Sequence, residues 1–259
     1  MSVPNVVSKH REKALFGAKE LLEYKKSIGI GPRFKPPKSV ILCYQKDLMD
    51  FIERSFRVTV PPGSFRGLRL LEQTDGSVGV AGDFGFGAPI AVTVMEDLIA
   101  FGVREFLSIG YAGTIQKHIE IGDTVVCDRA VRDEGTSYHY LEDGKYARAS
   151  EGITERLKTA LANHKIKFTV AASWTTDAPY RETKLEIERY RAEGVATVDM
   201  EASALFALAE YREVSIGSAF TVSDSLADLE WKPRFKKPHV KRGLQKLFQV
   251  AVEALLMKS

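Results

Sequence analysis

Two acidic residues in this chain have the type and position to do chemistry. Asp224 follows the apolar strand predicted for Ser215–Val222, at the carboxyl end of a strand, where open α/β folds place ligands. A carboxyl group there could transfer a proton. Glu201 opens the helical pattern of Glu201–Tyr211, and its carboxylate could accept two hydrogen bonds from a vicinal diol. Each has a structural alternative: Ser223 and Asp224 suit a helix N-cap, and Glu201 suits the first turn of a helix.

A third feature is the glycine-rich run GDFGFGAP, from Gly82 to Pro89, which leads into the helix predicted for Pro89–Phe101. Backbone N–H groups of such a loop, together with a helix N-terminus, bind anions. A short glycine run also occurs in plain strand-to-helix turns. By itself it indicates anion binding only weakly.

The elements that must position these groups alternate between short apolar runs and amphipathic patterns. Strands are expected at Val40–Cys43, Phe106–Ile109, Asp123–Cys127, Phe168–Trp174, Val195–Asp199 and Ser215–Val222, with a hairpin at Leu68–Ala81 turning at Asp75-Gly76. Helices are expected at Ser8–Ser27, Lys46–Arg54, Pro89–Phe101, Glu151–Ala162, Glu182–Arg191, Glu201–Tyr211 and His239–Met257. This alternation predicts an α/β fold, a three-layer α/β/α sandwich around a central mixed β-sheet. The Gly/Pro linker Gly29–Pro37 predicts an N-terminal appendage of residues 1–37 and a main domain of residues 38–259.

The most informative stretch runs from Leu107 to Tyr140, LSIGYAGTIQKHIEIGDTVVCDRAVRDEGTSYHY. It combines a buried strand, a turn predicted at Gly110 and Gly113, a second strand, and a polar and aromatic loop. Together with Met200-Glu201 and Ser223-Asp224, it resembles the nucleoside phosphorylase and nucleosidase superfamily, enzymes that cut the bond between a base and its ribose. The resemblance implies a nucleoside phosphorylase-like catalytic domain. In that family this segment, including Arg132, Glu134 and Tyr138 here, forms one wall of the active site.

The resemblance implies roles for the two carboxylates. Splitting an N-glycosidic bond builds positive charge on the ribose and negative charge on the departing base, as in glycoside hydrolysis. Asp224 is expected to protonate a purine base. Glu201 is expected to hold the ribose hydroxyls, with Met200 against the sugar face.

The loop from Thr175 to Tyr180 resembles the family's base-binding loop. The resemblance implies the following base-binding residues: Tyr180 as the stacking ring, Arg181, Asp177 and Ser223, with Glu182 as a further edge reader. Asp177 suits a structural turn equally well. The glutamine and arginine that read uracil in uridine phosphorylases are replaced by Thr183 and Leu185, so a purine is expected.

The site for the attacking group departs from the family pattern. Phosphorylases of the family bind phosphate with arginines, glycines and a Ser/Thr hydroxyl. Of these, Gly85 remains, and Arg66 could stand in for the arginine that a neighbouring subunit donates. The other phosphate ligands are replaced by Tyr44, Leu48, Ser108 and Tyr111. The glutamate that activates water in family nucleosidases, expected near Leu48, is also missing.

Three functions follow from this pattern. The first is a purine nucleoside phosphorylase, a pentosyltransferase of purine salvage that uses phosphate as co-substrate and no other cofactor. The second is a nucleosidase that uses water, and the third is a relative that binds nucleosides without turning them over. Phosphate-dependent release of the base separates the first from the second, and tight binding without product indicates the third.

Composition excludes several other classes. The 259 residues carry 37 Lys and Arg against 34 Asp and Glu, a net charge of +3, too balanced for a dedicated nucleic-acid binder. No apolar run approaches the ~20 residues that cross a bilayer, and the N-terminus lacks a hydrophobic signal core. Cys43 and Cys127 lie in apolar runs and are expected to be reduced thiols. We therefore expect a cytoplasmic protein without a membrane partner.

The remaining expectations concern metals and partners. The five histidines have no metal-ligand spacing, so no metal is expected. Members of the family assemble as dimers or hexamers, which implies a homo-oligomer. The basic run Trp231–Arg242 could bind an anion or act as a gating segment, and a solvated linker explains it equally well.

Overall fold

The computed structural model describes residue 6, residues 9–65 and residues 67–257. Its strands are β1 (Ser39–Cys43), β2 (Val58–Thr59), β3 (Leu68–Leu71), β4 (Val78–Ala81), β5 (Glu105–Thr114), β6 (Thr124–Asp133), β7 (Tyr146–Arg148), β8 (Phe168–Thr176), β9 (Val195–Asp199), β10 (Ser215–Ser225) and β11 (Lys232–Pro233). Its α-helices are α1 (Ala18–Ser27), α2 (Lys46–Ser55), α3 (Ala88–Phe101), α4 (Glu151–Asn163), α5 (Lys184–Ala192), α6 (Ala202–Tyr211) and α7 (Pro238–Leu256). Short 3₁₀ turns lie at Lys9–Arg11, Glu72–Thr74, Ser137–His139 and Pro179–Arg181.

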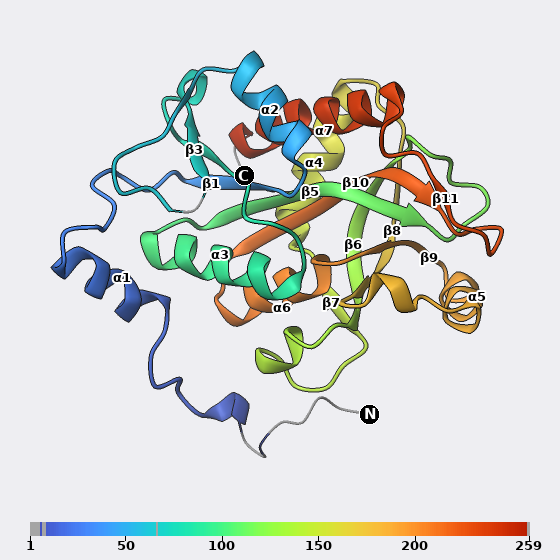
Figure 1. Ribbon diagram of the computed structural model, residues 1–259, viewed down its shortest axis with the longest axis horizontal. Coiled ribbons are helices and arrows are strands. Elements are labelled where there is room, and N and C mark those ends of the chain that lie inside the picture. The colour runs from blue at the N-terminus through green and yellow to red at the C-terminus, as the bar shows by residue number, and fades with distance from the viewer. Residues whose placement is uncertain (1–5, 7–8, 66, 258–259) are drawn as a thin grey trace.

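Helices cover both faces of one mixed sheet. In Figure 1, α2, α4 and α7 lie above the strands and α3 and α6 lie below them. Neighbouring residues of β5 point to opposite faces, as strand geometry requires: Phe106 joins the apolar core under α3 and α6, and Leu107 joins the core under α2, α4 and α7. This arrangement confirms the predicted α/β fold around a central mixed sheet.

Five strands of the sheet close into a ring. Among the described residues, β10 pairs with both β5 and β6, β6 with β8, β8 with β9, and β9 with β5. At one end of this ring Gly113 of β5 is paired with Asp224 of β10 on one side and with Val198 of β9 on the other. The ring therefore brings residues far apart in the chain to a single place.

The prediction of a turn at Gly110 and Gly113 is wrong, because both glycines lie inside β5. A Cβ atom on Gly113 would lie 3.1 Å from Asp224 Oδ2, and one on Gly110 would lie 3.1 Å from the Tyr44 ring. These contacts are tighter than a side chain normally tolerates. The two glycines allow close approach of neighbouring side chains and do not reverse the chain.

The first helix is shorter than predicted. It begins at Ala18, and residues Lys9–Arg11 form a separate 3₁₀ turn. The N–H of Gly17 donates to Glu20 Oε2 at 2.8 Å, and glycine disfavours continuing the helix upstream. The helix packs on α3, where Leu22 is buried and Lys25 Nζ lies 3.8 Å from Asp97 Oδ2. None of the described helices is both long and apolar enough to cross a membrane.

Candidate active site

A cavity of about 770 Å³ opens at the end of the strand ring. The sequence-predicted residues that line it are Met200, Glu201, Ser223, Asp224, Tyr180, Glu182, Tyr44 and Tyr111. Asp224 comes from β10, and Glu201 follows Met200 just after the end of β9. The two predicted functional carboxylates therefore face one cleft.

Asp224 is held by two hydrogen bonds. Ser223 Oγ donates to Oδ1 at 2.7 Å, and Trp231 Nε1 donates to Oδ2 at 2.9 Å. The register of β10 shifts between Val222 and Asp224, and Asp224 then pairs with Pro233 of β11. Because β10 continues to Ser225 and no helix begins there, the N-cap alternative for Asp224 is wrong.

Glu201 lies at the junction of β9 and α6, and its side chain is buried. The backbone N–H of Gly87 donates to its Oε1 at 2.6 Å. Burial, and to a smaller extent the nearby carboxylate of Asp199, raise the pKa of Glu201 to about 8, against the opposing effect of the Gly87 hydrogen bond. The carboxyl group is therefore poised between its two protonation states near neutral pH.

Asp199, a cavity residue that sequence analysis did not single out, caps α6 in place of Glu201. Its Oδ2 accepts from the N–H groups of Glu201 and Ala202 at 2.8 and 2.7 Å, and its Oδ1 accepts from the hydroxyls of Ser173 and Thr175. Burial raises the pKa of Asp199, and the four hydrogen bonds oppose that shift. Because Asp199 satisfies the first N–H groups of the helix, the Glu201 side chain is free to face the cavity.

The glycine-rich loop reaches the site through two positive-φ glycines. Gly85 has φ +94° and Gly87 has φ +103°. Phe86 lines the cavity, whereas Gly85 does not. The N–H of Gly87, at the start of α3, is already bonded to Glu201. The positive end of the α3 dipole therefore already faces a carboxyl group of the protein itself, that of Glu201.

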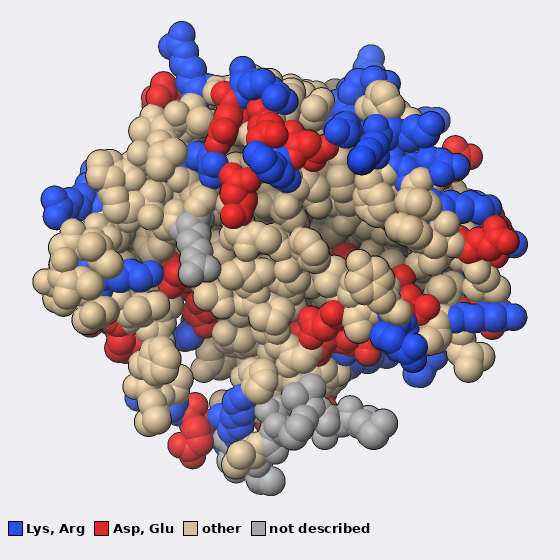
Figure 2. Space-filling view, viewed as in Figure 1, with Lys and Arg blue, Asp and Glu red and all other residues tan. Residues whose placement is uncertain are grey.

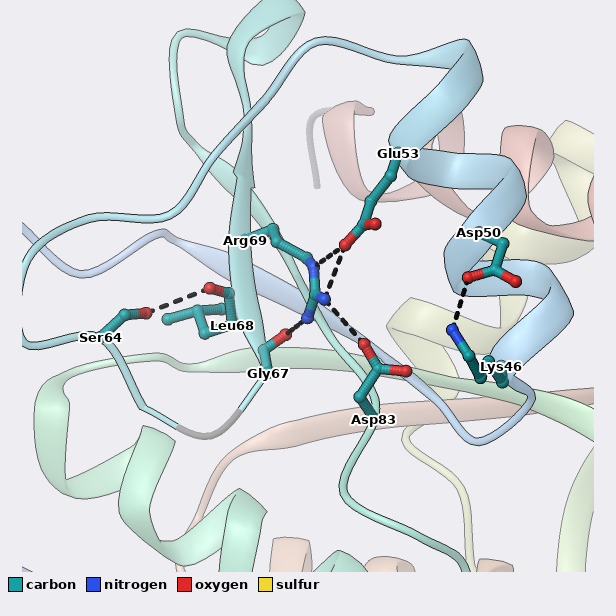
Figure 3. Close-up of polar contacts among 8 residues, drawn as sticks. All are labelled: Lys46, Asp50, Glu53, Ser64, Gly67, Leu68, Arg69 and Asp83. Atoms are coloured by element: carbon teal, nitrogen blue, oxygen red, sulfur yellow. Dashed lines mark hydrogen bonds and ion pairs between the residues drawn. The ribbon is translucent and has the colours of Figure 1, made fainter.

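An arginine anchors the start of this loop, as Figure 3 shows. Arg69 of β3 donates to Glu53 of α2 and to Asp83 of the loop, each at 2.7 Å, and to the carbonyl oxygen of Gly67 at 2.7 Å. Asp83 has a positive φ of 58°, which is uncommon for a residue other than glycine. The network ties α2 and β3 to the loop that carries Gly87.

Only part of the residues that were predicted to bind the base line the cavity. Tyr180 lines the cavity but is 98% exposed. Arg181 and Asp177 do not line it: Asp177 is exposed and its Oδ2 accepts from the N–H of Gly135 at 2.8 Å. Asp177 thus joins two loops, which matches the structural-turn alternative.

Three further side chains complete this end of the cavity. Glu182 lines it, and burial together with the charge of Asp224 raises the pKa of Glu182 to about 7. Trp231 and Phe235 line it from the basic run after β10. The sequence marked this run by its basic residues, as an anion-binding or gating segment, and gave no sign that the Trp231 indole bonds Asp224.

The predicted acceptor side is uncharged. Tyr44 lines the cavity, and its hydroxyl lies 2.8 Å from Ser108 Oγ, which is buried behind it and does not reach the cavity. The hydroxyl of Tyr111 is buried without a hydrogen-bond partner among the described residues. Leu48 is part of an apolar core. Arg66, the predicted substitute for a donated arginine, lies outside the described residues.

The loop from Arg132 to Tyr140 does not form the predicted wall. Arg132 donates to Ser137 Oγ at 2.9 Å, and Glu134 accepts from the Ser137 N–H and from Ser203 Oγ, each at 2.9 Å. These bonds shape the loop and hold it on α6. Of the Leu107–Tyr140 segment, only Tyr111 to Gly113 line the cavity.

The charge of the cavity is one-sided. Its lining contains four acidic residues, Glu182, Asp199, Glu201 and Asp224, and no Lys, Arg or His among the described residues. Over the same described residues, no group of three or more His, Cys, Asp or Glu is arranged to hold a metal ion. The arrangement suits proton transfer and hydroxyl binding by carboxyl groups.

The family model described as the phosphorylase superfamily matches residues 41–256. The chain belongs to the phosphorylase superfamily. The chain is 32% identical over 144 residues to a guanosine phosphorylase from Halorubrum lacusprofundi, covering 55% of this chain and 59% of that protein. It is 29% identical over 150 residues to a uridine phosphorylase from Salmonella typhimurium, covering 52% of this chain and 59% of that protein. The chain thus spans little more than half the length of these two relatives.

A solved structure extends the likeness to nearly the whole fold. The AMP nucleosidase from Bacteroides thetaiotaomicron superimposes with a TM-score of 0.70 at 17% identity, covering 92% of this chain and 96% of that chain. At this identity the likeness concerns the fold alone. Phosphorylases and nucleosidases therefore share the architecture of this superfamily member.

Proposed function

We propose that this protein cleaves the N-glycosidic bond of a purine nucleoside, with phosphate as the attacking group. The observation that carries the proposal is the position of Asp224 and Glu201, which face one cavity: Asp224 lies on β10, Glu201 lies just after β9, and both strands pair with β5. One carboxyl group serves the departing base and the other serves the sugar.

Asp224 is proposed as the general acid. As the bond breaks, its proton moves to a ring nitrogen of the purine and Asp224 becomes a carboxylate. The Ser223 hydroxyl and the Trp231 indole N–H donate to its two oxygens. Both contacts fix the orientation of the carboxyl group in the cavity.

Glu201 is proposed to bind the ribose 2′- and 3′-hydroxyls, with Met200 beside it. An ionised carboxylate accepts both hydroxyls, and the Gly87 N–H at the start of α3 supports the negative charge. The same charge also stabilises the positive ribose of the transition state.

Hydrolysis by water is the second candidate. The absence of a basic residue among the described lining residues favours it, because a phosphate dianion would enter beside four carboxyl groups. To decide, we would incubate the protein with a nucleoside panel with and without phosphate and measure free base and the sugar product. Ribose 1-phosphate supports phosphorolysis, and ribose formed without phosphate supports hydrolysis. If neither forms while a nucleoside binds tightly, the protein is a binding relative.

The choice of a purine and a role in purine salvage are part of the same proposal. A relative named guanosine phosphorylase supports it, although a relative named uridine phosphorylase is also similar. Thr183, where uridine phosphorylases have glutamine, caps α5 with its side chain and does not line the cavity. A panel with inosine, guanosine, adenosine and uridine tests the choice: faster release of uracil than of any purine would contradict it.

We also propose a cytoplasmic homo-oligomer. Two buried free thiols, Cys43 and Cys127, fit a reducing compartment. Phe86, Tyr180 and Trp231 are each more than 60% exposed at the cavity rim, which favours a covering partner. Light scattering during size-exclusion chromatography tests the assembly, and a monomer at all concentrations would contradict it.

A further inference from the structure

The cavity and the segment that follows Asp224 differ in charge. Four carboxyl groups line the cavity, and no described lining residue is basic. The segment Lys232–Lys237, here called the basic segment, carries four basic residues in six positions. A phosphate group near the active site therefore finds no cation in the described cavity lining and is attracted by this segment.

The basic segment lies against the catalytic residues. Pro233 pairs with Asp224 in the sheet, and the N–H of Arg234 donates to the carbonyl oxygen of Ser223 at 2.9 Å. Phe235 lines the cavity, with its ring centroid 6.2 Å from that of Tyr111. It also lines a second hollow of about 520 Å³, which is formed by residues 233–237. The two hollows thus meet at Phe235.

Three of the four cations lack a counter-ion within the described part of the chain. Lys232 Nζ pairs with Asp228 Oδ2 at 2.5 Å. Arg234, Lys236 and Lys237 are exposed and form no salt bridge with a described residue, and the guanidinium of Arg234 donates only to the backbone of Pro233. Like charges placed side by side repel one another, and an anion between them relieves that repulsion.

The helix that follows adds to the same potential. α7 is 19 residues long, begins at Pro238 directly after Lys237, and has no acidic residue in its first turn. Its N-terminus therefore carries uncompensated positive partial charge. Figure 2 shows Lys and Arg gathered on the upper right of this face, beside a hollow, over the region where Figure 1 draws β11 and the start of α7.

We propose that the basic segment binds a phosphate group at the mouth of the active site. The proposal rests on the proposed function, because the site adjoins the cavity assigned to the nucleoside. The phosphate is either the inorganic co-substrate or the 5′-phosphate of a nucleoside monophosphate. Either source replaces the missing cationic ligands at Tyr44, Leu48, Ser108 and Tyr111 with cations from another part of the chain.

The test compares two triple variants with the same change in charge. The first is Arg234→Gln, Lys236→Gln, Lys237→Gln. The control is Arg54→Gln, Lys167→Gln, Lys246→Gln, three exposed residues that line none of the hollows described above. Base release is measured with nucleosides at varied inorganic phosphate, and with nucleoside 5′-monophosphates without phosphate. Thermal unfolding with and without each anion reports binding independently of turnover.

We expect the first variant to raise the KM for inorganic phosphate or for the nucleotide by about tenfold or more, since hydrogen bonds to charged groups carry that much affinity. The KM of the first variant for the unphosphorylated nucleoside stays at the wild-type value. All KM values of the control variant stay at wild-type values. The arm that responds identifies the source of the phosphate. Wild-type KM values in both arms would overturn the proposal and identify the segment as a solvated linker.

If the wild-type protein releases no base in any arm, the proposed function fails and the unfolding data decide the binding site. Stabilisation by inorganic phosphate or by a nucleotide that is lost only in the first variant supports the site. Equal unfolding midpoints for the two variants with these anions overturn it.

Discussion

The two halves of the cavity are built on different principles. On the leaving-group half, Asp224, Asp199 and Glu201 are each fixed by named donors at 2.6 to 2.9 Å. On the acceptor half, Tyr44 and Tyr111 present rings, and the buried Gln45 Oε1 and Tyr111 hydroxyl have no partner among the described residues. Under the proposed function, the first half places the proton that is transferred and the ribose diol. The second half leaves the attacking group undefined.

The difference in hydrogen bonding between the two halves shows which part of the cavity holds its side chains in a fixed geometry. Buried polar groups with all partners satisfied hold one geometry, whereas buried groups without partners carry an energetic cost that a ligand can relieve. Gln45 Oε1 and the Tyr111 hydroxyl are buried groups of the second kind among the described residues, so the acceptor half is not held in one geometry by hydrogen bonds.

Asp224→Asn tests the leaving-group half most severely. The amide keeps the shape but has no carboxylic proton to donate, so kcat should fall by roughly 10²- to 10⁴-fold, the usual contribution of a general acid. The matched control is Asp177→Asn, because Asp177 bonds Gly135 outside the cavity and an amide oxygen can accept the same hydrogen bond. Turnover of a purine nucleoside is measured for both. Near wild-type turnover of Asp224→Asn would end the assignment of this half.

Glu201→Gln should have the next largest effect. Losing charge-assisted hydrogen bonds to the ribose hydroxyls should lower kcat/KM by roughly 10- to 100-fold. The variant should also discriminate less between a nucleoside and its 2′-deoxy analogue. Glu210→Gln, an exposed change on the same helix, is the control. An unchanged preference for the 2′-hydroxyl in Glu201→Gln would remove Glu201 from the sugar site.

The sequence predicted that Asp224 and Glu201 face one cleft, but it did not predict the residues that surround them. Met200-Glu201 and Ser223-Asp224 are local motifs, so each could be found by its spacing. The end of β10 could not, since Asp224 stays in a strand only through pairing with Pro233, nine residues later, and with Gly113, far earlier in the chain. Gly113 looked like a turn glycine for the same reason. A glycine is needed at position 113 because the Asp224 side chain of β10 lies against it.

The pH profile should sharpen the contrast between the halves. Burial raises the pKa of Glu201 to about 8, so below that pH the empty site holds the neutral acid and ribose binding weakens. The value of kcat/KM should rise by about tenfold per pH unit toward pH 8 and level off above it, and Glu201→Gln should lack this limb. The folded pKa of Glu201 lies above the ordinary glutamate value of 4.5, so the stability that the neutral form contributes is lost as the pH rises from 4.5 to about 8. The unfolding midpoints of the wild-type protein and of Glu201→Gln should converge or cross between pH 5 and pH 9.

Arg69 tests whether the leaving-group half depends on support from outside the cavity. Arg69→Met leaves Glu53 and Asp83 unpaired, and the free energy of unfolding should fall by about 1–3 kcal/mol. Because Asp83 begins the loop that carries Gly87, the KM for the nucleoside should rise more than kcat falls. Arg54→Met, an exposed change on α2, controls for the loss of charge. Loss of stability with unchanged KM would limit Arg69 to a structural role.

Ser108→Ala should have the smallest effect, although the family resemblance predicts a phosphate ligand at this position. Ser108 is buried behind Tyr44 and makes one hydrogen bond with it, so the change removes about 1 kcal/mol of stability. Because the side chain does not reach the cavity, kcat and the KM for phosphate should stay within about twofold of wild type, as for changes that touch neither substrate nor transition state. Tyr44→Phe is the companion variant, because it removes the same hydrogen bond from the residue that does line the cavity. A larger rise in phosphate KM for Ser108→Ala than for Tyr44→Phe would mean that the acceptor binds behind Tyr44, and the contrast between the two halves would then be wrong.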